Sequence, residues 1–594
     1  MVKDRKSIDS RYKWNIDEMY NNKESLENDI NKVEDLITEL KSYKGKLSKG
    51  KDNLYQVLKM SEDASRILEK LYVYTHMKMH EDTRINENQA IATKIEMLST
   101  ELSIATSYMT PELMSMDEEK LNEYLSSSEL SFYKKYIDDI LRERPHILSE
   151  KEEEILAAAS DISGVAENVY DMLSFADLEF PEIEDEDGNK VKLTHSNFSV
   201  FLKSKNQRVR ESAFKGLYSV YDKYKNTFAS TLYGAIKSEI FYAKMRKYKS
   251  ALEGSLFKDD VSVDVYNNLI LAIDENLDSL NKYIDLKKRF LGLEKIHMYD
   301  LYVPLTENFD IKIPYEKAQD IILNALKPLG EEYLSIIKNA FEEGWIDVYE
   351  NEGKQGGAYS WGSYDSHPYI LMNYHDDLNS LFTLIHELGH SVHSYYSRSN
   401  QEYLYSGYKI FVAEVASTLN ELLLINYLLE NSQSKEERIY LLNYYLEQFR
   451  TTVYRQTMFA EFEKITHDMV ENKNPLTAKE FTDIYYNLNQ KYYGKSCDVD
   501  SQIGLEWARI PHFYSNFYVY KYATGFSAAS ALSQQILTEG EVAVKRYIEF
   551  LKSGGSDYPL NQLRDAGVDM EKKESVDKAL SVFSDLVDKL EKEL

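Results

Sequence analysis

The sequence predicts a mainly α-helical fold, and three observations support this. Only 10 prolines and 23 glycines interrupt 594 residues, whereas the helix-favouring residues Leu, Glu, Lys and Ala abound. Apolar residues recur at helical spacing, for example at Leu54, Val57, Leu58, Ala64, Leu68, Leu71 and Tyr72. Because a chain of this length exceeds what one core supports, we expect at least two lobes or one elongated multi-layer body.

The N-terminal third reads as successive amphipathic helices that end in a hairpin. Helices are expected over residues 24–175, with short polar breaks between them. Over residues 178–194, two short apolar runs flank the turn sequence Asp-Glu-Asp-Gly-Asn, which predicts a β-hairpin. We place a domain boundary after this hairpin, giving an N-terminal helical domain over 1–200 and a second domain over 201–594.

A small sheet is expected in the second domain. Helices resume over residues 200–350, and the densest glycine cluster of the chain, 353–362, then requires a loop or a loop-to-strand passage. Residues 367–374 form a plausible strand with its proline near the start, where a missing donor is tolerated. Beyond residue 376 the chain is expected to be helical almost throughout, so the sheet precedes a long helix.

Composition excludes several classes of function. The net charge of −28 disfavours nucleic acid as a partner, because a polyanion would be repelled on approach. A single cysteine, Cys497, excludes a disulfide within the chain and fits a reducing compartment. We find no signal-peptide pattern and no run of 18 apolar residues, and the mean hydropathy is −0.50. A cytoplasmic protein without a membrane span is therefore expected.

One five-residue run has the pattern of a metal site: His386-Glu387-Leu388-Gly389-His390. Histidines four apart on a helix lie one turn above each other, so both imidazoles can reach one metal ion. The glutamate lies about 100° round the helix and can reach a bound water without joining the coordination shell. We therefore expect His386 and His390 to bind zinc and Glu387 to act as the general base.

The flanking residues fit a helix packed on one side. Apolar residues occupy the side opposite the histidines, at Leu381, Leu384, Ile385, Leu388 and Val392. Gly389 lacks a side chain just before the second histidine, which would let another backbone or a peptide approach closely. The histidines are then expected to line a cavity.

A catalytic zinc needs a third protein ligand and one open position. Glu414 is the best candidate, because an unpaired carboxylate in its apolar surroundings would be costly. A histidine six residues after His390 is excluded, since position 396 is Tyr. Glu421, seven residues after Glu414 on the same helix face, would orient a ligand histidine or be solvated. His393 would support the ligands or be an ordinary buried histidine.

Three other features have simpler interpretations. The glycine cluster lacks the order of a nucleotide-binding loop, in which Gly-Lys comes last. His76 and His80 are also four apart, but no glutamate follows the first, so we expect them on an ordinary helix surface. The segment 510–522 contains many aromatic side chains that carry a hydrogen-bond donor. From its residues alone, we expect these side chains to pack against other parts of the protein.

Taken together, these motifs resemble oligoendopeptidase F within the thimet-oligopeptidase-like zinc peptidases. The resemblance rests on His386, Glu387, His390, Glu414, the loop 356–362, the run Ser-His-Pro-Tyr-Ile-Leu-Met-Asn-Tyr at 366–374, His512, and the run Lys-Ser-Gly-Gly-Ser-Asp-Tyr-Pro at 552–559. It covers nearly the whole chain. The departures are Glu414-Val415-Ala416-Ser417, which lacks the proline of the thimet branch, and the spacing of the tyrosines after His512.

The resemblance implies a prolate helical fold with a deep channel, two lobes, and a small sheet beside the zinc-binding helices. It also implies that His512 and a following tyrosine donate hydrogen bonds to the oxyanion. Tyr518 is favoured and Tyr522 is the second choice, while Tyr514 and Tyr520 stay open. Gly357, Tyr359, His367 and Tyr522 are candidate substrate contacts.

The expected function is that of a zinc endopeptidase with one Zn²⁺ per chain, acting on short unfolded oligopeptides. The peptide would lie extended along the edge of the strand at 367–374. A zinc exopeptidase and a catalytically inactive peptide-binding protein are the alternatives. The sequence leaves the oligomeric state and the cleavage preference open.

Overall fold

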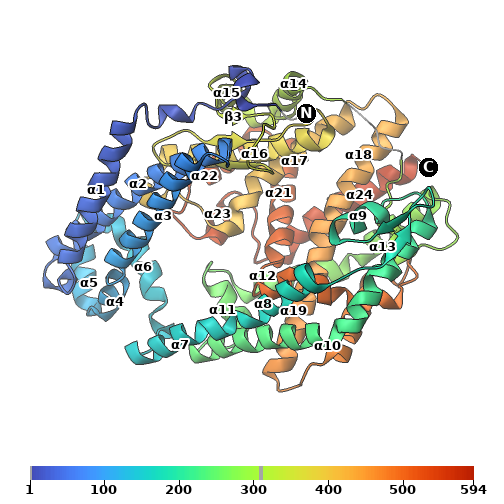
Figure 1. The fold of residues 1–594 in the computed structure, drawn as a ribbon, viewed down its shortest axis with the longest axis horizontal. Coiled ribbons are helices and arrows are strands. Elements are labelled where there is room, and N and C mark those ends of the chain that lie inside the picture. The colour runs from blue at the N-terminus through green and yellow to red at the C-terminus, as the bar shows by residue number, and fades with distance from the viewer. Residues whose placement is uncertain (1–2, 307–311, 594) are drawn as a thin grey trace. The chain divides into compact units, whose positions relative to one another are not determined.

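The computed structural model describes residues 3–306 and 312–593, and it is mostly helical, as predicted (Figure 1). The chain divides into two compact units of three segments each. Unit 1 comprises Met1–Pro145, Asp310–Tyr427 and Leu532–Gly567, and unit 2 comprises His146–Phe309, Leu428–Ala531 and Val568–Leu594. The chain thus passes between the units five times. The boundary expected near residue 200 lies inside unit 2, so that division stays a prediction.

The N-terminal part of unit 1 is a layer of helices that share one apolar core. Three long helices, α1 (Lys23–Ser42), α2 (Lys51–Glu81) and α3 (Asn86–Thr106), lie side by side (Figure 1). The amphipathic spacing in α2 is confirmed, since Leu54, Val57 and Leu71 are fully buried. Three shorter helices follow: α4 (Met109–Ser115), α5 (Glu118–Leu125) and α6 (Lys134–Arg142).

The predicted small sheet lies in unit 1 and has three strands, β3 (Ile346–Asp347), β4 (Tyr359–Trp361) and β5 (Tyr369–Leu371). Their order is β3-β5-β4, with β3 parallel and β4 antiparallel to β5. A strand at 367–374 is confirmed, but the prediction that it offers an edge to substrate is wrong. Both sides of β5 are already paired, and the residues flanking β3 are bonded to the N-terminal segment, by Val348 N–H to Tyr12 and by Asn15 N–H to Gly344, so β4 has the open edge.

One face of this sheet packs on the N-terminal helices. Tyr369 and Leu371 belong to the same core as α1–α3, and Tyr359 and Trp361 pack against it. The expectation that His76 and His80 lie on an ordinary helix surface is therefore wrong. His76 is buried and bonded to Glu96 at 3.1 Å, and His80 Nδ1 lies 2.8 Å from the Tyr359 hydroxyl.

The long helix expected after residue 376 is α16 (Leu378–Asn400), and α17 (Ile410–Glu430) follows it. The Asp377 side chain caps α16 by accepting a bond from Ser380 N–H at 2.7 Å. The predicted apolar side is confirmed, since Leu381, Leu384, Ile385, Leu388 and Val392 are all buried. Unit 1 is completed by α14 (Tyr315–Ala325), α15 (Gly330–Glu342), α22 (Glu541–Lys552) and α23 (Pro559–Asp565).

Among the described residues, α17 is the one helix long and apolar enough to cross a membrane, judged by length and composition. Most of its apolar window, 56%, is buried inside the protein, and core helices of soluble proteins pass the same test. Three glutamates, Glu414, Glu421 and Glu430, also lie on it. The helix is therefore weak support for a membrane span.

Unit 2 contains the predicted hairpin, formed by β1 (Glu182–Glu184) and β2 (Lys190–Lys192) in antiparallel register. The π-helical stretch η11 (Phe449–Tyr454) joins α18 (Lys435–Gln448) to α19 (Arg455–Glu471). The helices of the unit are α7 (Glu150–Ser163), α8 (Val165–Asp171), α9 (His195–Leu202), α10 (Gln207–Met245), α11 (Ala251–Phe257), α12 (Val263–Glu275), α13 (Leu277–Phe290), α18 (Lys435–Gln448), α19 (Arg455–Glu471), α20 (Ala478–Tyr493) and α24 (Lys573–Lys592). Finally, α21 (Tyr520–Glu539) begins in unit 2 and ends in unit 1.

Candidate active site

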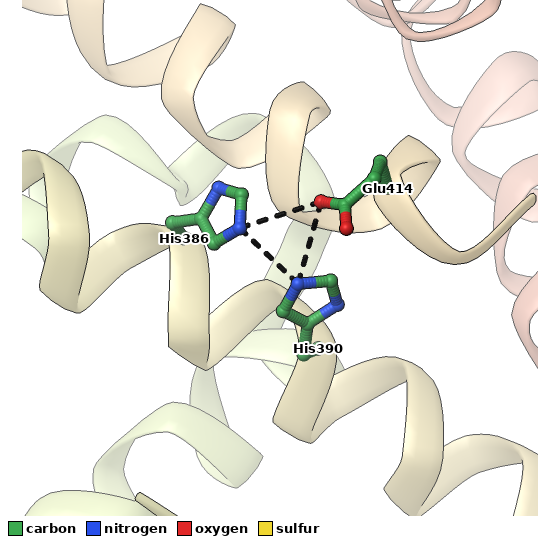
Figure 2. Close-up of side chains that lie close together, drawn as sticks. All are labelled: His386, His390 and Glu414. Carbon is green, nitrogen blue, oxygen red and sulfur yellow. Dashed lines mark hydrogen bonds and ion pairs between the residues drawn. The ribbon is translucent and has the colours of Figure 1, made fainter. Parts of the chain in front are cut away.

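The structure brings His386, His390 and Glu414 together as a cluster of three ligand atoms (Figure 2). The Nε2 atoms of the two histidines are 3.2 Å apart, and Glu414 Oε2 lies 3.4 and 3.5 Å from them. In a tetrahedral zinc site with bonds of about 2.0–2.1 Å, ligand atoms lie roughly 3.3–3.4 Å apart. The three separations therefore fit one metal ion and leave a fourth position for another ligand.

Two further side chains fix the orientation of these ligands. Glu421 is bonded through Oε1 to Nδ1 of His386, which directs Nε2 of that ring toward the cluster. Ser417 Oγ donates to Glu414 Oε2 at 3.0 Å from the next turn of α17. One ligand from each helix, His386 of α16 and Glu414 of α17, is thus held in place by a hydrogen bond to a residue of α17.

Gly389 lies where α17 crosses α16. A Cβ atom at this position would lie 2.5 Å from Ser417 Cα and 2.8 Å from the carbonyl oxygen of Ala416. These are backbone atoms, which cannot move aside as a side chain would. The close approach predicted for Gly389 is confirmed, and the partner is the backbone of the helix that presents Glu414.

Glu387 lies beside the cluster, with 8% of the residue exposed. Burial raises the pKa of its carboxyl group, while His386 and His390 lower it and Glu414 raises it again. The backbone N–H of Ser360, in β4, donates to the carboxylate. The Ser360 hydroxyl also lies 2.8 Å from that of Ser391 in α16, which ties the open-edge strand to the histidine helix.

The charges of the metal-free cluster follow from these contacts. Burial alone would lower the pKa of His386, but hydrogen bonds to Glu414 and Glu421 raise it to about 10. Burial would raise the pKa of Glu414, but bonds to the two histidines lower it well below its usual range. At neutral pH the metal-free protein therefore carries a proton on His386 that occupies the place of the metal.

Metal binding should consequently release this proton. A metal needs neutral imidazole, so between pH 7 and 9, below the His386 pKa, the apparent affinity should rise about tenfold per pH unit. Calorimetric titration in buffers of different ionisation enthalpy should show about one proton released from His386 per metal bound. Glu421→Gln removes one group that raises this pKa, so it should release less at pH 8. An affinity independent of pH would contradict the assignment.

The remaining predicted residues of unit 1 have partners outside the cluster. His393 is buried and stacks on Tyr408 at 3.7 Å, and burial lowers its pKa to about 3. Its Nδ1 atom has no hydrogen-bond partner among the described residues, so its supporting role stays a prediction. The Tyr359 ring lies on the sheet face that packs on α1–α3, and His367 is bonded to Glu18 and stacked on Trp345. Gly357 accepts a bond from Asn373 at 2.8 Å in the loop before β4.

The residues predicted for the oxyanion form a cluster of their own in unit 2. His512, in the short turn η13 (Pro511–Tyr514), lies 3.4 Å from the Tyr522 hydroxyl, and the Tyr518 ring is 6.4 Å from the imidazole. Burial lowers the pKa of His512, which keeps it neutral at pH 7. Tyr514 instead bonds Thr231 at 2.7 Å, and Tyr520 packs on Tyr266. Tyr518 and Tyr522 are therefore the tyrosines grouped with His512.

Reasoning from the sequence missed two residues and gave one wrong argument. Ser417 follows Glu414 by three positions, so helical spacing could have identified it. Ser360 had no such signal, because its place depends on the register of the sheet. The apolar setting claimed for Glu414 is not found, since 47% of its side chain is exposed. The assignment of Glu414 as a metal ligand therefore depends on its distances to the two histidines and not on its burial.

Comparison with known families agrees with this geometry. The model described as Peptidase family M3 matches residues 200–582, and the one described as Oligopeptidase F matches residues 112–180. With the His-His-Glu cluster, these matches define the chain as a metallopeptidase. The chain belongs to peptidase family M3, in its oligopeptidase F group.

Individual relatives match over the full length. Oligopeptidase PepF of Bacillus subtilis (strain 168) is 48% identical, over 99% of this chain and 88% of the relative. Group B oligopeptidase PepB of Streptococcus agalactiae is 38% identical over 100% of this chain and 98% of the relative. The crystal structure of oligoendopeptidase-F from Enterococcus faecium has a TM-score of 0.73 and 38% identity, covering 96% of this chain and 99% of that one.

Proposed function

We propose that this metallo-oligopeptidase uses one zinc ion per chain, held by His386, His390 and Glu414, to cleave internal bonds of short unfolded oligopeptides. The observation that carries the proposal is the tetrahedral spacing of the three ligand atoms, with Glu387 beside them. Two imidazoles, one carboxylate and an open fourth position are typical of catalytic zinc. A cytoplasmic location, which the single buried Cys497 fits, is part of the proposal.

The metal and the side chains beside it would have different roles in the hydrolysis. When bound, the metal would polarise the scissile carbonyl and acidify the attacking water. Glu387 accepts the proton of that water and returns it to the leaving amine. Its partial burial and raised pKa suit both transfers, because a carboxylate with greater proton affinity is the better base. The Ser360 N–H holds the carboxylate in place while this occurs.

The open edge of β4 replaces the edge of 367–374 as the proposed support for the peptide. Ser360 pairs with Ile370 in the middle of β4, and Ile370 N–H points to the other neighbour of β5, bonding Trp345. By the alternation of antiparallel strands, the backbone groups of Ser360 then face away from β5. Because Glu387 already accepts the Ser360 N–H, the Ser360 carbonyl is the group that this edge offers to a peptide, which would lie next to Glu387, with Gly357 and the Tyr359 backbone close to its path.

The proposal includes the oxyanion donors of unit 2. His512 with Tyr518, or with Tyr522 as the second choice, would donate hydrogen bonds to the developing negative charge. The grouping of these three rings in one cluster supports the assignment. His393 and Glu421 complete it as residues that support the ligand histidines, with the bond to Glu421 the better supported of the two.

Metal analysis and peptide cleavage test the proposal together. We expect one zinc per chain and cleavage of a quenched peptide whose two ends are blocked. Chelation should abolish this cleavage, and added zinc should restore it. Cleavage only of peptides with a free end would identify an exopeptidase. Stoichiometric zinc without cleavage would identify an inactive peptide-binding protein, and the absence of zinc would overturn the proposal altogether.

A further inference from the structure

A second site-like feature lies wholly within unit 2 and has no part in the chemistry above. It is a cavity of about 270 Å³ with mostly apolar walls, including Phe198, Phe214 and Leu301. Three arginines, Arg450, Arg455 and Arg509, also line it, whereas Glu506 is the one carboxylate among its lining residues. The cavity thus gathers three cations although the chain as a whole has a net charge of −28.

Positive charge exceeds negative charge around this cavity. Glu506 is shared by two cations, since it accepts bonds from Arg455 at 2.9 and 3.0 Å and from Arg509 at 3.0 Å. Glu447 is likewise shared by Arg450, at 2.6 Å, and by Lys287, at 3.2 Å. Each carboxylate neutralises only one of its two partners. The cluster therefore has two cations more than carboxylates.

The pKa values agree with this excess. Burial would raise the pKa of Glu506, but Arg455 and Arg509 lower it to about 2. Burial lowers the pKa of Lys287 to about 8, and repulsion from Arg450 adds to that effect. Uncompensated cations in a poorly solvated position are costly, so an anion in the cavity would stabilise the unit.

Two donors of the cavity wall have free hydrogen-bonding positions. Among the described residues, Arg509 uses only Nη1, so its Nε and Nη2 have no partner. These two atoms form one edge of the guanidinium, which matches the two oxygens of a carboxylate. The Tyr302 hydroxyl, in the same wall, has no hydrogen-bond partner among those residues either.

The backbone at Arg450 is also unusual. Arg450 lies in η11, the six-residue π-helical stretch between α18 and α19. Such insertions in α-helices are rare and frequently occur at functional sites. Here the insertion places the arginine against the Tyr302 ring, 4.8 Å from its centroid.

We propose that this cavity binds a small organic carboxylate that carries an apolar group. The carboxylate would take the free Nε–Nη2 edge of Arg509 and the Tyr302 hydroxyl. The apolar group would lie against Phe198, Phe214 and Leu301. This inference does not depend on the metal site, because all these residues belong to unit 2.

Calorimetric titration of the zinc-loaded protein with benzoate, at constant ionic strength, tests the proposal. We expect saturable binding that Arg509→Gln weakens by about 10- to 100-fold, the loss expected for hydrogen bonds to a charged group. Arg509→Lys keeps the positive charge but loses the paired N–H donors of the guanidinium edge, so it should weaken binding similarly. Any benzoate bound at the metal would be unaffected by either change, so the Arg509-dependent part isolates this cavity.

The controls follow from the pairing of the charges. Arg208→Gln removes the same charge from the surface of α10, where Arg208 pairs with Glu184, and should leave binding unchanged. Arg509→Gln leaves Glu506 with Arg455, so the variant should fold; if it does not, Tyr302→Phe should still weaken binding several-fold. The proposal is overturned if no benzoate binding depends on Arg509. It is also overturned if chloride or inorganic phosphate binds as tightly as benzoate, because the apolar walls would then play no part.

Discussion

Replacing Glu387 with Gln should reduce peptide cleavage by roughly 10²- to 10⁴-fold while the metal stays bound. The amide has the same shape and can still accept the Ser360 N–H, so the side chain should keep its place. It cannot accept a proton from the attacking water. The loss should therefore appear in kcat, with little change in KM.

Metal content and steady-state kinetics on a peptide with both ends blocked check this expectation. Glu342→Gln makes the same substitution on the surface of unit 1 and should have no effect. Glu414→Gln should lose metal as well as activity, because it changes a ligand. Near-normal turnover in Glu387→Gln would show that Glu387 is not the general base.

Replacing Gly389 with Ala should disrupt the metal site without changing any ligand. The added methyl group would lie 2.5–2.8 Å from the backbone of Ser417 and Ala416, so α17 would have to move away from α16. Because Glu414 is on α17 and both histidines are on α16, the three ligand atoms would separate. We expect metal affinity to fall at least about 100-fold and stability by about 1–3 kcal/mol, as in other overpacked cores.

Competition with a chromophoric chelator measures the metal affinity, and denaturant unfolding measures the stability. Gly356→Ala is the matched control, because a Cβ atom there meets nothing within 4 Å and the backbone is not in the left-handed region that requires glycine. If Gly389→Ala had the metal affinity and stability of the unchanged protein, α16 and α17 would not need glycine at their crossing.

The two histidine ligands could be predicted from the sequence because helical spacing is local: His386 and His390 are separated by one turn, so the periodicity alone aligns them. The buried side of α16 was predictable for the same reason. Each of these inferences needed fewer than ten residues of context. Periodicity does not bring Glu414 to them, because Glu414 lies on the next helix, 24 residues after His390.

The sheet and the two units could not be predicted in this way. Whether β5 is central or at an edge depends on β3, which has only two residues and no strand signal of its own. The assignment of β4 as the open edge depends on that pairing and on the bonds that join the residues flanking β3 to the N-terminal segment. The units are assembled from segments far apart along the chain, and no local pattern records which segments meet.

The interleaving of the two units constrains how the protein can be synthesised. The histidine helix α16 packs on α22, which begins at Glu541, more than 150 residues after His386. At roughly 5–20 residues per second, translation needs about 10–30 s to cover that distance. The ribosome therefore releases the metal ligands well before α22, which packs on their helix, so a nascent chain should gain proteolytic activity only after α22 has emerged.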